Sequence, residues 1–216
     1  MCIVNCSKTE ETEPRTDATG FLAYIHGSIV GAHFIEASLD TCSEDQHNRR
    51  CLAACRQLVS KEIAGVVISG EMGTGKTHLL IGTIMDIARL EQADDPFTIQ
   101  GGIDVMRPPR HILYWKSDEL ASLLREGSYD IRDQCKRVPV LAIDDLGTEH
   151  ASDFIQTAYQ SIFDARYENR RSTIITTNLT SDEIDERYTQ RVMSRWQEAY
   201  SLFHLGGPDR RARKAS

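Results

Sequence analysis

The stretch Gly65-Val66-Val67-Ile68-Ser69-Gly70-Glu71-Met72-Gly73-Thr74-Gly75-Lys76-Thr77 leads from a short apolar segment into a glycine-rich loop. Residues 70–77 match the pattern G-x-x-x-x-G-K-S/T of the phosphate-binding P-loop. Residues 65–69 predict a buried strand, and residues 78–90 carry apolar side chains at helical spacing. A P-loop requires a strand, a glycine loop and a helix in this order. The stretch therefore predicts an α/β nucleotide-binding fold.

The residue types in this loop explain why it would bind phosphate. Glycines at positions 70, 73 and 75 let the backbone form a concavity whose N–H groups point at an anion. Lys76 can reach the β- and γ-phosphates, and the Thr77 hydroxyl can ligate Mg²⁺. We therefore expect ATP and Mg²⁺ as cofactors. The expected nucleotide-binding residues here are Gly70, Glu71, Met72, Gly73, Thr74, Gly75, Lys76, Thr77 and His78.

Strands and helices alternate along the rest of the chain. Capping boxes at Ser43–Gln46 and Thr180–Glu183 indicate two helix starts. Further strands are predicted at 111–116, 138–143 and 172–176, and further helices at 44–60, 118–126, 151–169 and 181–200. Such alternation predicts a parallel sheet with helices on both faces. Residues 91–110 are predicted to be an exposed insertion, in which Arg107 and Arg110 either bind DNA or a partner or lie on a tolerated surface loop.

Composition limits the class of protein. The chain has 216 residues, a net charge of −7 and 40 % hydrophobic residues. These values suit one domain with a short appendage and argue against a generally basic nucleic-acid-binding coat, while a local basic site stays compatible with them. No apolar run approaches the length of a membrane span, and the N-terminus lacks the basic-then-apolar order of a secretion signal. We expect a cytoplasmic protein that does not contact membranes.

The six cysteines are interpreted as reduced residues rather than a disulfide framework. Cys51 and Cys55 are spaced to share one helical face with Leu52 and Leu58, which favours packing in the core. The alternative is a zinc site with ligands among Cys2, Cys6, Cys42 and His47.

A P-loop site needs carboxylates at the end of a neighbouring strand. The apolar run that begins at Val140 ends in Asp144 and Asp145, so both carboxylates are expected at the carboxyl edge of the sheet. We expect Asp144 on the magnesium side and Asp145 as the group that polarises the attacking water, with Glu149 as an alternative for the second role. Asn178 follows the last predicted strand and either aligns the water or is a turn residue.

Three arginines, Arg187, Arg191 and Arg195, recur every four residues, so one continuous helix would place them on one face. One interpretation is a solvated ion-pair stripe in which Glu183 pairs with Arg187 and Glu198 pairs with Arg195. The other makes one arginine a finger that reaches the nucleotide of a neighbouring subunit.

Taken together, these motifs resemble the DnaC/IstB group of AAA+ ATPases, which comprises bacterial and phage helicase loaders and the ATPase helpers of certain transposons. The resemblance covers residues 32–212. The segments that carry it are 70–80, 141–149, 166–179, 186–195 and 206–211.

The resemblance implies roles for individual residues. Asn178 matches the sensor-1 polar residue, and Arg195 matches the arginine finger, with Arg191 as the second candidate. The segment that begins at Phe34 and ends at Asp40 matches the part of the family that lines the adenine pocket. Either Arg210 or Arg211 stands where relatives keep a sensor-2 arginine.

The resemblance also implies an architecture and an activity. We expect a flexible leader at 1–30, an AAA+ ATPase domain at 31–212 with a short or missing C-terminal lid, and a basic tail at 213–216. The implied activity is slow ATP hydrolysis, stimulated by a partner or DNA, in an ATP-dependent oligomer that remodels a replicative helicase on single-stranded or duplex DNA. The alternatives are a helper ATPase that serves a transposase, and an adaptor that binds ATP but scarcely hydrolyses it.

Overall fold

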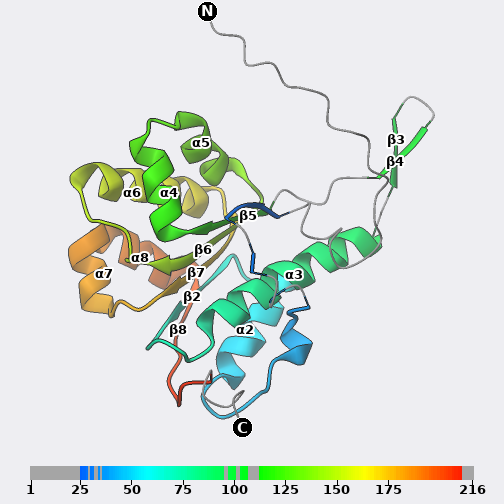
Figure 1. The fold of residues 1–216 in the computed structure, drawn as a ribbon, viewed down its shortest axis with the longest axis horizontal. Helices are drawn as coiled ribbons and strands as arrows, with labels where there is room; N and C mark the ends of the chain where they lie inside the picture. The colour runs from blue at the N-terminus through cyan, green and yellow to red at the C-terminus, as the bar shows by residue number, and fades with distance from the viewer. Residues whose placement is uncertain are drawn as a thin grey trace, which may run out of the picture.

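A parallel sheet of six strands forms the centre of the protein (Figure 1). The computed structural model describes residues 25–28, 30–31, 34, 36–94, 97–100, 103–106 and 112–210. In spatial order the strands are β1 (Ile25–Gly27), β5 (Ile112–Lys116), β6 (Val140–Leu146), β7 (Ser172–Thr177), β2 (Gly65–Ser69) and β8 (Ser201–His204). Every neighbouring pair is parallel. The predicted parallel sheet is confirmed, and β1 and β8 are additions that the sequence patterns did not indicate.

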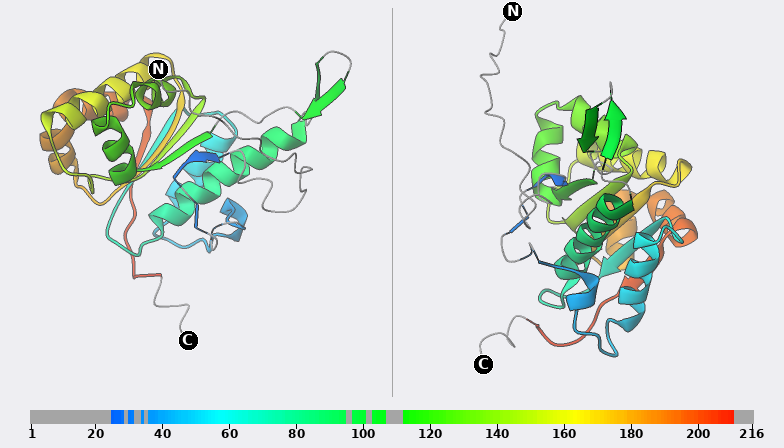
Figure 2. Two further views of the ribbon diagram at one scale, coloured as in Figure 1. Left: turned by 45° about the horizontal axis from the view of Figure 1, so that its top comes forward. Right: turned by 90° about the vertical axis from the view of Figure 1, so that its right-hand side faces the viewer.

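Helices cover both faces of this sheet, as predicted (Figures 1 and 2). The helices are α2 (Arg49–Val59), α3 (Lys76–Asp94), α4 (Ser117–Arg125), α5 (Tyr129–Arg137), α6 (Asp153–Glu168), α7 (Ser181–Tyr188) and α8 (Gln190–Ala199). Alternate residues of a strand point to opposite faces, and in β2 Val66 and Ile68 join one core cluster with α2 and α3. Val67 between them joins the other cluster, with α4, α5, α6, α7 and α8.

Helix α2 begins at Arg49, later than expected, because the residues before it form a turn of their own. The Asp45 carboxylate accepts the N–H groups of His47 at 2.9 Å and Asn48 at 3.1 Å, and the Asn48 side chain accepts the Asp45 N–H at 2.8 Å. Aspartate and asparagine commonly stabilise turns in this way. The predicted capping box at Ser43–Gln46 is therefore wrong.

The capping box at Thr180 is confirmed, but the helix that it opens is shorter than predicted. The Thr180 hydroxyl accepts the Glu183 N–H, and the Glu183 carboxylate accepts the Thr180 N–H at 2.7 Å. The helix then ends, and Thr189 directly after it has a positive φ of 77°. This break separates α7 from α8, so the predicted single helix to residue 200 is wrong, and Arg187 lies on a different helix from Arg191 and Arg195.

The predicted insertion at 91–110 contains a hairpin that the sequence patterns did not indicate. Helix α3 continues to Asp94, and β3 (Phe97–Gln100) pairs in antiparallel fashion with β4 (Ile103–Met106). The hairpin projects beyond the end of α3 (Figure 2). The available signal was Gly101-Gly102, because two glycines between short apolar segments are typical of a two-residue hairpin connection. Arg107 and Arg110 lie outside the described residues.

Cys51 and Cys55 pack in the core with Leu52 and Leu58, as expected. The cysteines at 42, 51, 55 and 135 are free thiols. Among the residues that the structure describes, no cluster of histidine, cysteine or acidic side chains could hold a metal ion. Cys2 and Cys6, most of the predicted leader and the tail at 213–216 lie outside that part of the chain.

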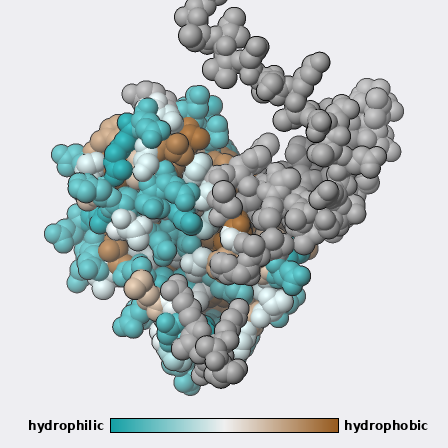
Figure 3. Space-filling view, in the orientation of Figure 1, coloured by the Kyte–Doolittle hydropathy of each residue, from teal (hydrophilic) through white to brown (hydrophobic). Residues whose placement is uncertain are grey.

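The surface visible in Figure 3 is mainly hydrophilic, and its apolar residues form small separate areas. Within the described ranges, no helix is both long enough and apolar enough to cross a membrane. Among the side chains that the structure describes, the exposed large apolar ones are Met72, Leu90, Phe154 and Leu202.

Arg166 of α6 is a fully buried cation that joins α5, β6 and β7. Its guanidinium donates five hydrogen bonds, to the Thr173 hydroxyl and to the carbonyls of Cys135, Val138, Pro139 and Ser172. Burial lowers the pKa of Arg166 to about 10, so the group stays charged at neutral pH. Arginine suits this position because its planar group carries five N–H donors in a fixed arrangement.

We expect Arg166→Lys to lower the free energy of unfolding by about 2–4 kcal/mol, because three ammonium donors leave buried carbonyls unpaired. Equilibrium unfolding in urea measures this change. The matched control is Arg137→Lys on α5, whose side chain is 78 % exposed; we expect a change below about 0.5 kcal/mol there. Equal stability of the Arg166→Lys variant and the wild type would contradict the role assigned to these hydrogen bonds.

Candidate nucleotide-binding site

The P-loop joins the end of β2 to the first turn of α3. Its three glycines have positive φ angles, 144° at Gly70, 80° at Gly73 and 100° at Gly75. Residues with a side chain rarely adopt such angles, so glycine is needed at each position. This backbone has the irregular, concave form in which N–H groups gather around an anion.

Lys76 is held inside this loop. Its side chain is buried, and its Nζ donates to the carbonyls of Gly70 at 2.9 Å and Glu71 at 2.8 Å. The Thr74 hydroxyl also donates to the Glu71 carbonyl at 2.8 Å. Met72, at the tip of the loop, is 74 % exposed. Backbone carbonyls of the loop therefore hold the ammonium group within the loop.

A β-bulge in β6 places two consecutive carboxylates at the same edge of the sheet. Ile143 pairs with Ile175 and Leu146 with Thr177, so β6 contains one residue more than β7 between these pairs. Asp145 has φ 53°, and its N–H donates to the Thr176 hydroxyl at 2.8 Å. Bulges change the direction of side chains and are frequent beside active sites. A regular strand would have sent Asp144 and Asp145 to opposite faces.

Asp144 makes the direct connection between β6 and the P-loop. Its Oδ1 accepts the hydroxyls of Thr77 at 3.1 Å and Thr176 at 2.5 Å, and its Oδ2 accepts the Tyr114 hydroxyl at 3.4 Å. Burial raises the pKa of the Asp144 carboxyl, and the nearby Asp145 charge adds to this, against the opposing effect of the three hydroxyl donors. The sequence patterns did not indicate these contacts of Thr176 and Tyr114. Their polar groups near the end of an apolar strand could have indicated a position beside the site.

The predicted metal ligands fit Mg²⁺. The Thr77 hydroxyl and the Asp144 carboxylate lie side by side and are hard oxygen donors, which Mg²⁺ prefers. A cation at this position would also favour the ionised form of a carboxylate that burial disfavours. The residues present are therefore suited to the ion that accompanies ATP.

Asp145 and Asn178 lie at the same edge of the sheet. Asp145 is half-buried in the bulge, and Asn178 is exposed directly after β7, which lies between β6 and β2. In parallel sheets the carboxyl ends of neighbouring strands meet at one edge, where ligands bind. The tertiary structure thus brings Lys76, Asp144, Asp145 and Asn178 to one edge, although Asn178 lies 102 positions after Lys76 in the sequence.

The position of Glu149 does not suit the activation of water, the role for which the sequence made it an alternative to Asp145. Its side chain is 1 % exposed. The carboxylate accepts four hydrogen bonds, from the Ser117 hydroxyl at 2.5 Å, the Gly147 N–H at 2.8 Å, Arg187 at 3.3 Å and the Tyr188 hydroxyl. A carboxylate with this many donors has no capacity left for a water molecule. Its placement argues against water activation and indicates a link between α4, α7 and the loop after β6.

The predicted adenine-side segment packs on α3 just beyond the P-loop. The rings of Phe34 and His78 are 5.9 Å apart between centroids. The Asp86 carboxylate of α3 accepts the Leu39 N–H at 2.9 Å, and Arg89 donates to the Ala37 carbonyl at 2.9 Å. The structure therefore places Phe34 and His78 together beside the first turn of α3.

Arg195 lies on α8, in the helical layer opposite the one that contains α3. Its guanidinium pairs with Asp164 and lies 3.8 Å from Glu168, and it stands 5.0 Å from the ring centroid of Tyr167. Arg191 also pairs with Asp164, at 3.3 Å, and its side chain is 57 % exposed.

The predicted pairs of Arg187 with Glu183 and of Arg195 with Glu198 are wrong. Arg187 pairs with Glu149 instead, and Glu183 caps α7. Each predicted pair lies within a single helix, so the reason is competition from other partners: the cap takes Glu183, and Asp164 of α6 takes Arg195. Arg210 pairs with Asp45 at 2.6 Å, and Arg211 lies outside the described residues.

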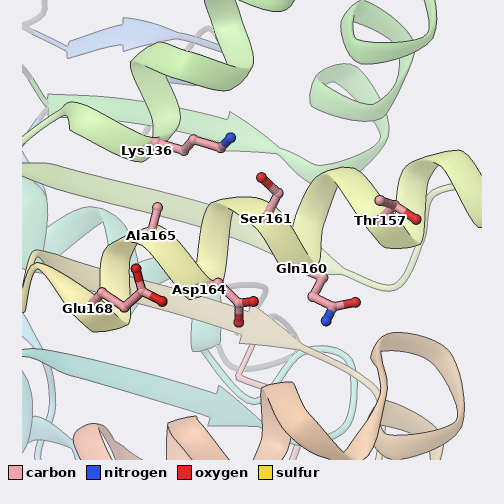
Figure 4. A pocket seen from close by; sticks show the side chains of 7 residues that line it. All are labelled: Lys136, Thr157, Gln160, Ser161, Asp164, Ala165 and Glu168. Carbon is pink, nitrogen blue, oxygen red and sulfur yellow. The ribbon is translucent and has the colours of Figure 1, made fainter.

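A shallow groove on the outer side of α6 is separate from this site. Figure 4 shows Lys136 reaching over from α5, while the other lining side chains come from α6. Its lining includes Asp164, the partner of Arg195, but none of the predicted nucleotide-binding residues.

No protein-family model matches the chain. The replicative helicase loader DnaC of Escherichia coli (strain K12) is 25 % identical over an alignment of 171 residues, which covers 75 % of this chain and 65 % of that protein. The chain thus spans less than two thirds of the length of the curated relatives it matches.

Two solved structures are similar in fold. The crystal structure of DnaI has a TM-score of 0.70 and 20 % identity, over 88 % of this chain and 98 % of that one. The crystal structure of the DnaC helicase loader has a TM-score of 0.63 and 25 % identity, over 82 % of this chain and all of that one. The fold is that of an α/β P-loop NTPase, and the predicted resemblance to DnaC-type AAA+ ATPases is confirmed.

We expect Glu149→Gln to lower the free energy of unfolding by about 2–4 kcal/mol, because an amide NH₂ would face groups that are themselves donors. Chemical denaturation measures the loss. Glu119→Gln on α4 is the matched control, since the Glu119 side chain is 45 % exposed. We expect this substitution to change the free energy of unfolding by less than about 0.5 kcal/mol. If both variants have the same free energy of unfolding as the wild type, the stabilising role assigned to the hydrogen bonds of Glu149 is contradicted.

Proposed function

We propose that this chain binds Mg-ATP and hydrolyses it as an ATPase of DNA replication, in the manner of a helicase loader. The observation that carries the proposal is the contact between Thr77 and Asp144 at 3.1 Å. It joins the P-loop to a pair of carboxylates, which is the arrangement that nucleoside triphosphate hydrolysis requires. The similarity to DnaC supports the replication context.

Each residue at the sheet edge has a proposed task. Lys76 binds the β- and γ-phosphates, and the P-loop N–H groups from Gly70 to Thr77 surround them. Thr77 and Asp144 would hold Mg²⁺, which would neutralise charge on the phosphate oxygens. Asp145 polarises the attacking water and Asn178 aligns it. Phe34 and His78 contact the adenine side.

The transition state needs a further positive charge, and we propose that Arg195 of a neighbouring subunit provides it. Arg195 lies in the layer opposite α3, so in this fold it is remote from the first turn of that helix. In an oligomer, α8 of one subunit would face the nucleotide of the next. Hydrolysis by the isolated chain would then be slow, because the finger arrives only with assembly. Its contacts with Asp164 and Tyr167 would hold it ready within its own subunit.

We propose a replicative helicase, bound to single-stranded or duplex DNA, as the partner that the oligomer remodels. The curated relative is named a replicative helicase loader. Loss of the γ-phosphate would remove the charge that holds the subunit junction together and so release the partner. The ATPase domain proposed for this activity spans residues 31–212.

Asp145→Asn should bind ATP with wild-type affinity and hydrolyse it about 100-fold more slowly, because the amide cannot accept a proton from the attacking water. Lys76→Ala should lose nucleotide binding itself, because it removes the charge that faces the phosphates. Titration with a fluorescent ATP analogue and steady-state phosphate release separate the two effects. Undiminished turnover in Asp145→Asn would refute the assignment of the water-activating group.

The same Asp145→Asn variant, kept in ATP, serves to identify the partner. Affinity capture should retain a replicative helicase, and it should retain nothing comparable with the Lys76→Ala variant as bait. Retention of a transposase instead would support the transposition alternative and overturn the loader proposal.

Arg195→Ala should leave nucleotide affinity unchanged but lower turnover by at least about 10-fold at protein concentrations where the wild type is oligomeric. Arg191→Ala is the matched control, since Arg191 shares the helix and the Asp164 partner but is largely exposed. Turnover measured against protein concentration tests the difference. Normal hydrolysis by an oligomeric Arg195→Ala variant would exclude the finger role.

A further inference from the structure

The residues directly after β8, Leu205–Arg210, run along the P-loop, and we call them the C-terminal strap. Figure 1 shows the chain leaving β8 and passing toward the end of the molecule that contains α2. The Leu205 N–H donates to the Ser69 carbonyl at 2.7 Å, and the Arg210 N–H donates to the Gly73 carbonyl at 2.9 Å. The strap is therefore hydrogen-bonded to the strand before the loop and to the middle of the loop.

Each of the three P-loop glycines faces one residue of the strap. A side chain at Gly70 would overlap the Leu205 carbonyl, and one at Gly73 would overlap the Asp209 carboxyl group. At Gly75 a Cβ would lie 3.2 Å from the Arg210 Cδ. The strap thus fills the space along the loop that side chains would need. At Gly73 the strap contacts the loop twice, through the Arg210 N–H on the carbonyl and through the adjacent Asp209 carboxyl group.

The far end of the strap is tied to the turn before α2. The Arg210 guanidinium donates to the Asp45 carboxylate at 2.6 Å and to the Ser43 carbonyl at 3.4 Å. Asp45 is already oriented, since its other oxygen accepts the N–H groups of His47 and Asn48. Burial acts to raise the pKa of Asp45, but the two N–H groups and Arg210 together outweigh it and lower the pKa, so the carboxyl group is ionised at neutral pH.

We infer that Arg210 is a positioning residue for the nucleotide site, whose pairing with Asp45 clamps the strap against the P-loop and so maintains the phosphate-binding shape of the loop. This inference rests on the proposed binding of ATP. It differs from a sensor-2 role, because here Arg210 acts through the loop backbone and its guanidinium engages Asp45. The carboxylate partner is therefore as important for binding as the arginine.

The test is a double-mutant cycle of Asp45→Asn and Arg210→Gln, read out as the Kd for ADP and for ATP. The Asp45→Asn change would keep an oxygen for the His47 and Asn48 N–H groups and remove only the charge. We expect each single variant to weaken both nucleotides about three- to tenfold, in keeping with a partly exposed ion pair. The double variant should be no weaker than either single one, and Arg210→Lys should recover most of the affinity.

The control is Arg49→Gln, which removes an exposed ion pair with Glu44 near the same turn, without contact to the P-loop. We expect its nucleotide affinity to equal that of the wild type. Thermal unfolding of all variants separates loss of fold from loss of binding. A lower melting temperature with unchanged Kd values in the cycle would overturn the inference.

Three further results are decisive. If Arg210→Gln weakens ATP but not ADP, and Asp45→Asn weakens neither, then Arg210 contacts the γ-phosphate directly and the positioning role is wrong. If the wild type binds neither nucleotide, the proposed function fails and this inference fails with it. Wild-type binding with unaffected variants would overturn the inference alone.

Discussion

The hydrogen bond between the Thr77 hydroxyl and the Asp144 carboxylate is the contact on which the rest of the site depends. It connects the first turn of α3 to β6, which is not a neighbour of β2 in the sheet. Strand β7 lies between them and contributes the Thr176 hydroxyl to the same carboxylate oxygen. Three elements distant in sequence therefore meet at one buried oxygen, and an arrangement of the strands that separated them would remove the hydroxyl donors of that oxygen.

Two buried carboxylates at this end of the protein have opposite surroundings. Asp144 accepts three hydroxyls and keeps a raised pKa, so a cation beside it would be favourable. Glu149 accepts four donors, one of them the charged Arg187, and has no capacity left for a ligand. The first belongs to the proposed nucleotide site, and the second stabilises the loop between them. Both residues carry a carboxylate, so the residue type does not distinguish their roles. The number and the charge of the hydrogen-bond donors around each carboxylate distinguish them.

Sequence patterns correctly predicted the elements that are stabilised by contacts between residues close together in the sequence. The strand at 65–69, the helix after the P-loop and the capping box at Thr180 all depend on residues a few positions apart, and they occur as expected. The predictions that failed have two causes. The start of α2 at Arg49 follows from a competing local turn between Asp45 and Asn48, whereas the pairing of Arg187 follows from Glu149, 38 residues away. The strand β8 forms only because β2 offers a free edge.

The sequence by itself determined the P-loop, the carboxylates after a buried strand and the α/β alternation, because each is encoded in neighbouring residues. Only the tertiary structure decided how those groups face one another. The bulge that turns Asp145 and the break at Thr189 are backbone conformations with positive φ at residues other than glycine. Surrounding contacts must hold such conformations in place, since the local residue preferences oppose them. The strap is set in the same way, because its hydrogen bonds and its ion pair join residues more than 130 positions apart, and no local pattern encodes such a distance.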